Sequence, residues 1–426
     1  MINGHYVPES LRRGIVRRVG LIMLAAVVIA CSGSTDADDA ATTGIAPAAV
    51  AATATASTAS TPVPTDSATA TPVVATPLGV GCSDRIAFRS APVDLSATEV
   101  IVPLGLMSGS HVTPVDHIYF QNNSNRTLDI DVFTPAAGTV TRIERMSQTQ
   151  ADSGAEPIDD FRLVIEHGCL LSSIFIHVAS LAPALAAVAP PLGQYTSVDV
   201  RVQAGDLIGS YRGNVDYNVV DLDVNLPGLL IPASYEREPW KIHAAPPFAY
   251  FTDEIQAQMN AKSLRAEAPF DGRFDYDIDG RLVGNWFQQG TNGYGGSDPQ
   301  RYWAGHLAIA YDHLDPSHVV ISIGTFDGAS LQLAVRGNTP DPADVTVESG
   351  LVSYELVEYD YFVPGGQRWD RGSYAAGIEA RNYDSTPRGV VLLQLIEDRL
   401  LKVETFPGKT STKVPGFTAA ALIYER

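Results

Sequence analysis

Beyond the first eighty residues, the chain is dominated by short runs in which hydrophobic and polar residues alternate. Residues 161–166 and 173–178 alternate on either side of Gly168, which is typical of two antiparallel strands joined by a turn. Residues 131–143 predict a strand, a turn with proline and glycine, and a second strand, and residues 202–209 predict another strand. Alternation with a period of two places one face of a sheet in a core, so this region is predicted to be mostly β.

The alternating pattern returns after a short stretch with helical spacing. Residues 248–264 have apolar positions near a 3.6-residue period, which predicts a short linking helix. From residue 268 to residue 426, short strands separated by turn residues predict an antiparallel β-barrel or sandwich. The expected strands are residues 307–311, 319–323, 331–335, 351–356, 390–395 and 419–424.

The first thirty-one residues depart from this pattern. Four arginines between residues 12 and 18 precede an uncharged apolar run at residues 21–30. Ten residues are too few to cross a hydrocarbon core of about 30 Å as a helix, but they fit the hydrophobic region of a signal peptide. The run ends in Val28-Ile29-Ala30-Cys31, which resembles the bacterial lipobox. This resemblance implies a lipid on Cys31 that holds the chain at a membrane; the alternative is a secreted protein in which this cysteine is incidental.

The composition changes sharply after Cys31. Residues 32–77 are almost entirely Ala, Thr, Ser, Pro, Val and Asp, a composition that cannot bury enough apolar surface to offset the entropy of ordering. We therefore expect a disordered tether and an extracytoplasmic, lipid-anchored protein. The predicted organisation is a signal peptide at 1–31, the tether at 32–77, a first β domain at 78–252, a linking helix at 253–267 and a second β domain at 268–426.

The charge of the chain indicates which partners it can bind, and its cysteines bear on the compartment in which it folds. The chain has 48 Asp and Glu against 29 Lys and Arg, and this acidic balance disfavours binding to nucleic acid. Two cysteines follow the anchor, Cys82 and Cys169. Outside the cytoplasm such a pair predicts one disulfide, whereas two buried free thiols are the alternative.

Four sequence elements, taken in order, resemble the lysostaphin-like zinc endopeptidases that cut peptidoglycan cross-bridges. Residues 134–140 match a strand with Pro and Gly, and residues 164–168 and 174–178 match a hairpin with a histidine in each strand. Residues 204–209 match the following Gly-Asp turn and strand. The resemblance implies the duplicated hybrid motif, an antiparallel β fold, over about 130 residues.

The resemblance also implies a zinc site. In that family a His-x3-Asp motif and the second His of a His-x-His motif hold zinc, and a water at the open position attacks the amide. His111 and Asp116 match the first motif with one extra residue between them, and His117 is an alternative ligand. His177 stands at the place of the catalytic histidine of the hairpin. A polar cluster at a β edge, and a half-buried His177, are the structural alternatives.

The last motif departs from the family. Asp221-Leu222-Asp223 is the best match to His-x-His. Asp223 could still ligate a metal. Asp221 stands at the catalytic position, but a carboxylate there cannot donate a proton at neutral pH as an imidazolium does. Solvated strand residues are the alternative reading of both aspartates. The sequence therefore predicts a retained fold without hydrolysis, and a domain that binds cell-wall material or envelope proteins.

Two other functions remain open from the sequence. The first is an active zinc endopeptidase that uses aspartates in place of histidines. The second is a carrier of a small apolar ligand in the second domain, because Gly284-Asn285-Trp286 is similar to the Gly-x-Trp of lipocalins. Three aromatic residues lie beside a glycine-rich loop: Tyr294, Tyr302 and Trp303. They would either stack on sugar rings or cover a barrel end.

Overall fold

The computed structural model describes residues 87–147, 158–168, 170–383 and 386–426. The predicted signal peptide with Cys31, the tether at 32–77 and the predicted disulfide partners Cys82 and Cys169 lie outside the described residues. Within the described ranges, no helix combines the length and the apolar composition needed to cross a membrane.

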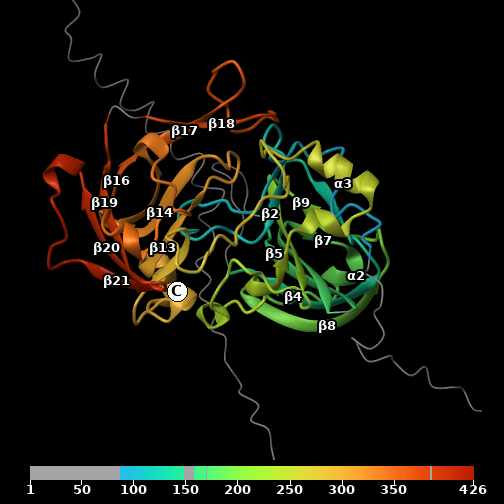
Figure 1. Cartoon of the computed structure of the whole chain (residues 1–426). Helices are drawn as coiled ribbons and strands as arrows, with labels where there is room; N and C mark the ends of the chain where they lie inside the picture. Colours follow the sequence, from blue (N-terminus) through green and yellow to red (C-terminus); the bar gives the residue numbers. More distant parts are fainter. Residues whose placement is uncertain (1–86, 148–157, 169, 384–385) are drawn as a thin grey trace, which may run out of the picture.

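The first half of the structure is built on one antiparallel sheet (Figure 1). The predicted hairpin is confirmed, since β5 and β6 pair antiparallel through the turn at Gly168. A central strand, β10, pairs with β2 on one side and with β6 on the other. The strands follow the order β1 (Val100–Val102), β2 (Ile118–Gln121), β10 (Asn214–Asp221), β6 (Leu171–Val178), β5 (Phe161–Gly168), β4 (Gly138–Arg145) and β8 (Gln194–Val202), and β11 (Ala244–Ala245) pairs with β10.

A second, smaller sheet packs with the first around one apolar core. It consists of β3 (Ile130–Phe133), β9 (Leu207–Tyr211) and β7 (Ser180–Leu181) in that order, all antiparallel. Val132 of the small sheet and Phe175 of the large sheet are fully buried members of the same cluster. The strand predicted at residues 202–209 is divided, because a turn at Gly205 separates the end of β8 from the start of β9.

In the described ranges, helices are few and short. The predicted linking helix is confirmed only in its middle, as α3 (Asp253–Asn260), which carries two acidic residues in its first turn where they favour the helix dipole. The Ala-rich stretch forms one turn, α2 (Pro183–Ala186). The 3-10 segments are η2 (Pro232–Tyr235), η3 (Lys241–His243), η4 (Pro247–Tyr250), η5 (Gly293–Gly295), η6 (Pro299–Gly305), η7 (Arg336–Asn338), η8 (Val347–Ser349) and η9 (Ser411–Lys413).

The second half forms a closed antiparallel barrel, so the barrel of the two predicted alternatives is the one found. Its strands run in order around the barrel: β12 (Gly284–Gln288), β13 (His306–Tyr311), β14 (Val319–Phe326), β15 (Ala329–Val335), β16 (Val352–Val357), β19 (Gly389–Glu397), β20 (Leu400–Pro407) and β21 (Leu422–Glu425). Trp286 is fully buried, its Nε1 donates to the carbonyl of Leu282 at 2.9 Å, and the guanidinium of Arg426 lies 3.7 Å from its ring centroid. A cation over an indole face stabilises the packing of Trp286.

The two halves share apolar packing. A two-stranded ribbon, β17 (Tyr359–Phe362) and β18 (Glu379–Asn382), leaves the barrel, and its Tyr361 packs in one cluster with Val102 and Tyr119 of β1 and β2. Phe287, Tyr294 and Tyr302 of the barrel half belong to the core of the first half. Tyr294 and Tyr302 are thus buried between the halves, and neither has the exposed ring face needed to stack on a sugar.

Candidate functional site

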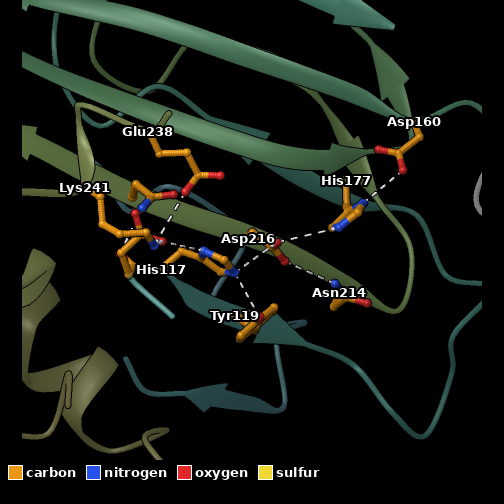
Figure 2. Close-up of polar contacts among 10 residues, drawn as sticks. His117, Tyr119, Asp160, His177, Asn214, Asp216, Glu238 and Lys241 are labelled. Carbon is orange, nitrogen blue, oxygen red and sulfur yellow. Dashed lines mark hydrogen bonds and ion pairs between the residues drawn. The ribbon is translucent and has the colours of Figure 1, made fainter. Parts of the chain in front are cut away.

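Asp116 and His117 lie immediately before β2, where the chain enters the large sheet. The Nδ1 atom of His117 is 3.3 Å from a carboxylate oxygen of Asp116, and its Nε2 atom is 2.8 Å from the hydroxyl of Tyr119. The same Nε2 atom is 3.4 Å from Asp216 (Figure 2). His117 is therefore held on both ring nitrogens by polar groups of three different residues.

His177 approaches Asp216 from the opposite side. It is the last residue but one of β6 and has a positive φ of 72°, which is uncommon for a residue with a side chain. Its Nδ1 atom lies 2.9 Å from Asp160, and its Nε2 atom lies 3.6 Å from Asp216. Figure 2 shows Asp216 between the two imidazoles, so these residues form one continuous polar chain from Asp160 to His117.

The register of β10 explains why Asp216 lies at this point. Asp216 is paired with Tyr119 in β2 and with Ile176 in β6, so it stands between β2, which follows directly after His117, and β6, which carries His177. Alternation places Asn218 on the same face, where its side-chain amide donates to the main-chain carbonyl of Asp116 at 2.8 Å. Burial raises the pKa of Asp216, while the charges of His177 and His117 oppose the rise.

A lysine completes the cluster. The ammonium of Lys241, in η3, lies 3.1 Å from Asp116 and 3.6 Å from Glu238, and it sits 4.9 Å from the centre of the Tyr294 ring. Lys241 is only 4% exposed. Burial alone would lower the pKa of Lys241, but the charges of Asp116 and Glu238 outweigh it and hold the pKa above its ordinary value. Lys241 is therefore a permanent cation inside the protein.

The same ion pair sets the charge of Asp116. Burial would raise the pKa of Asp116, but the ammonium of Lys241 and the hydrogen bond with His117 hold it well below its ordinary value. His111 lies nearby, with its ring centre 6.1 Å from that of His117. Burial, together with the charges of His117 and Lys241, lowers the pKa of His111 to about 3, so this imidazole is neutral at physiological pH.

The six residues singled out in the sequence divide into two groups. His111, Asp116, His117 and His177 gather around Asp216 and Lys241, whereas Asp221 and Asp223 do not. Asp221 is five residues beyond Asp216, a distance of about 17 Å along a strand. Because five is an odd number and side chains alternate along a strand, Asp221 points to the other face of β10. It accepts a hydrogen bond from the hydroxyl of Tyr250 at 2.5 Å, and Asp223 is exposed beyond the end of the strand.

Sequence reasoning missed Asp216, Asn218, Asp160, Glu238 and Lys241. A usable signal exists for the first two, because they are polar residues at alternate positions of a strand that is buried throughout. Lys241 gives no such signal, since a lysine within a loop is expected on the surface.

The charges around Asp116 oppose the binding of a zinc ion to this carboxylate. Among the described residues, no group of three or more His, Cys, Asp or Glu side chains could hold a metal. The stronger argument comes from the charges: a divalent cation on Asp116 would have to share this carboxylate with the ammonium of Lys241, 3.1 Å away, and would be repelled by it. The second carboxylate oxygen of Asp116 is buried without a hydrogen-bond partner in the described structure, so Lys241 provides the main compensation for its charge.

Comparisons with known proteins add no family assignment. A scan against models of protein families gives no match, and no curated protein matches the chain.

Proposed function

We propose that the chain is a lipid-anchored extracytoplasmic protein whose first domain is of the lysostaphin-like type, does not hydrolyse peptide bonds, and binds cell-wall or envelope components. The lipobox-like Val28-Ile29-Ala30-Cys31 and the tether after it support the anchor and the location. The large antiparallel sheet, with its hairpin from β5 to β6, supports the type of domain.

One observation supports the absence of hydrolysis: the ammonium of Lys241 lies 3.1 Å from Asp116 and would repel a metal ion bound to the same carboxylate. An ammonium has no empty orbital, so it cannot coordinate a water or a carbonyl oxygen as a metal ion does. It does neutralise Asp116, which keeps the carboxylate and the nearby histidines in place. In this proposal Lys241 balances the charge of Asp116 but supplies no metal chemistry.

The register of β10 supports the resemblance to the lysostaphin-like family, but it assigns the position of the His-x-His motif to different residues. Asp216 and Asn218, two positions apart and on one face, take the place of the His-x-His motif better than Asp221 and Asp223 do, because they lie beside His117 and Asp116. The second position is then an amide whose nitrogen is already donated to the main chain of Asp116. This arrangement supports a binding domain.

The first test measures metal, hydrolysis and binding on the full chain purified in detergent. We expect less than one tenth of an equivalent of zinc, no muropeptide release, and co-sedimentation with insoluble peptidoglycan. His177→Ala, at the partly exposed end of the cluster, should reduce co-sedimentation. Asp223→Asn, an exposed change outside the cluster, is the matched control and should not.

Two results would overturn the proposal. Stoichiometric zinc that is lost in Asp116→Ala, together with release of muropeptides, would favour the zinc endopeptidase. Equal sedimentation with and without peptidoglycan would remove the wall as the binding partner.

The anchor is tested separately. Cys31→Ser should move the protein from the detergent-soluble membrane fraction into the aqueous fraction, because two or three acyl chains are needed for firm attachment and the variant carries none. Unchanged partition in this variant would contradict lipidation.

The carrier function is not proposed, because the side chains inside the barrel form one buried apolar cluster. Trp286, Leu307 and Val391 are fully buried members of it.

A further inference from the structure

A cavity of about 410 Å³ opens over the small sheet, away from the contacts of the Lys241 cluster. Its walls come from β3, β7 and β9 and from the start of α2. Asp131 of β3 is paired with Ser210 of β9, and Ser210 is paired with Ser180 of β7. Residues directly opposite one another in a sheet point to the same face, so these three form one polar row across the cavity.

The lining of the cavity carries more negative than positive side chains. Beside it, Arg212 donates to both oxygens of Asp129, at 2.7 and 2.8 Å, and these hydrogen bonds lower the pKa of Asp129. The hydroxyls of Ser180 and Ser210 are 2.6 Å apart. Asp131 is exposed, and no described residue places a cation against its carboxylate. The cavity therefore offers one carboxylate that is not neutralised by the protein.

The rest of the lining is apolar. Leu207 is 48% exposed, and Leu181 and Pro183 line the same cavity. An exposed aliphatic side chain in a concave site favours a ligand with its own alkyl part. The cavity volume lies at the lower end of the range for small-molecule sites, which suits one side chain with its adjoining peptide groups.

We propose that this cavity binds a primary alkylammonium group carried on a peptide, such as the side chain of a lysine or of a similar diamino acid. The ammonium is placed at Asp131, beside Ser210, whose hydroxyl can accept a further hydrogen bond. The alkyl chain lies against Leu207 and Pro183. The inference does not rest on the function proposed above, because none of these residues contacts Asp116 or Lys241.

The test uses two probes that differ in one charge, titrated into the full chain in detergent by calorimetry or NMR. The first is Nα-acetyl-lysine N-methylamide, and the second is the same compound acetylated on its side-chain nitrogen, which removes the positive charge. We expect the first probe to bind about two- to fivefold more tightly, since an ion pair at an exposed carboxylate is worth up to about 1 kcal/mol. Raising the salt concentration to 0.5 M should weaken binding of the charged probe only.

Asp131→Asn should reduce the affinity for the charged probe by the same factor, about two- to fivefold. Asp199→Asn is the matched control, because Asp199 is an exposed strand aspartate of β8 that is not part of the cavity, and this variant should bind as the wild type does. Equal binding of the two probes, unchanged affinity in Asp131→Asn, or no binding of the charged probe up to 50 mM would each overturn the inference. Loss of co-sedimentation with peptidoglycan, with probe binding intact, would affect only the function proposed above.

Discussion

Replacing Lys241 with methionine tests the central feature of the site. Methionine keeps most of the apolar stem, so little packing is lost. The ammonium disappears, however, and leaves Asp116 buried at 6% exposure with its main compensating charge removed. Removing one partner of a buried ion pair typically costs about 3 to 5 kcal/mol. We expect a decrease of that size in the free energy of unfolding.

The assay is urea unfolding followed by tryptophan fluorescence at pH 7, where both charges of the pair are present. Asp116→Asn should cost less, because Glu238 remains 3.6 Å from the ammonium. The double variant should be more stable than Lys241→Met alone, since the buried carboxylate of Asp116 is then also absent. Lys409→Met, a change at an exposed lysine, is the control and should stay within about 0.5 kcal/mol of the wild type. A loss below about 1 kcal/mol for Lys241→Met, with strictly additive effects in the double variant, would refute the assignment of Lys241 as the compensating cation.

Three further predictions concern the packing around the site and the barrel. Gly209→Ala should destabilise the protein by about 2 kcal/mol in urea unfolding, because the new Cβ would lie 2.1 Å from a backbone oxygen of β7, whereas Gly416→Ala meets nothing within 4 Å and should be neutral. Burial lowers the pKa of His306 to about 3, so the unfolded chain binds a proton below about pH 6.5 and the folded chain does not. The free energy of unfolding therefore falls as the pH drops below about 6.5. His306→Asn should reduce the slope of this free energy against pH by up to about 1.4 kcal/mol per pH unit. An unchanged slope would contradict a neutral His306. Arg426→Ala should cost about 3 kcal/mol in thermal unfolding, because it uncovers Trp286 and leaves buried Asp277 without its cation, 3.6 Å away, while Arg426→Lys should recover part of the loss.

The sequence predicted the elements with strong alternation well. Residues 161–166 and 173–178 form the expected hairpin because their period of two matches a sheet with one buried face. The linking helix was overestimated because a 3.6-residue period over residues 248–264 does not show where the first helical hydrogen bonds form. Helix α3 begins only after Thr252, behind a 3-10 turn at Pro247–Tyr250.

Only part of the candidate site could be predicted from the sequence, because the rest depends on the register with which the strands pair. His117 and His177 could be identified from local sequence, but the aspartate between them depends on how β10 pairs with β2 and β6. A shift of a single residue in that pairing turns every side chain to the opposite face, so Asp216 and Asp221 cannot be distinguished without the sheet. Lys241 depends on a still longer contact, since its burial requires the Tyr294 ring from the barrel half.

The apolar packing between the two halves has a consequence for how the molecule comes apart. Phe287 and Tyr302 are numbered with the barrel but are buried in the core of the first half, and the ribbon of β17 and β18 lies against β1 and β2. Neither half can therefore be cut free without exposing part of a shared interior to water. A single cooperative melting transition follows for the folded region, and a protease acting between residues 260 and 284 would yield fragments that aggregate.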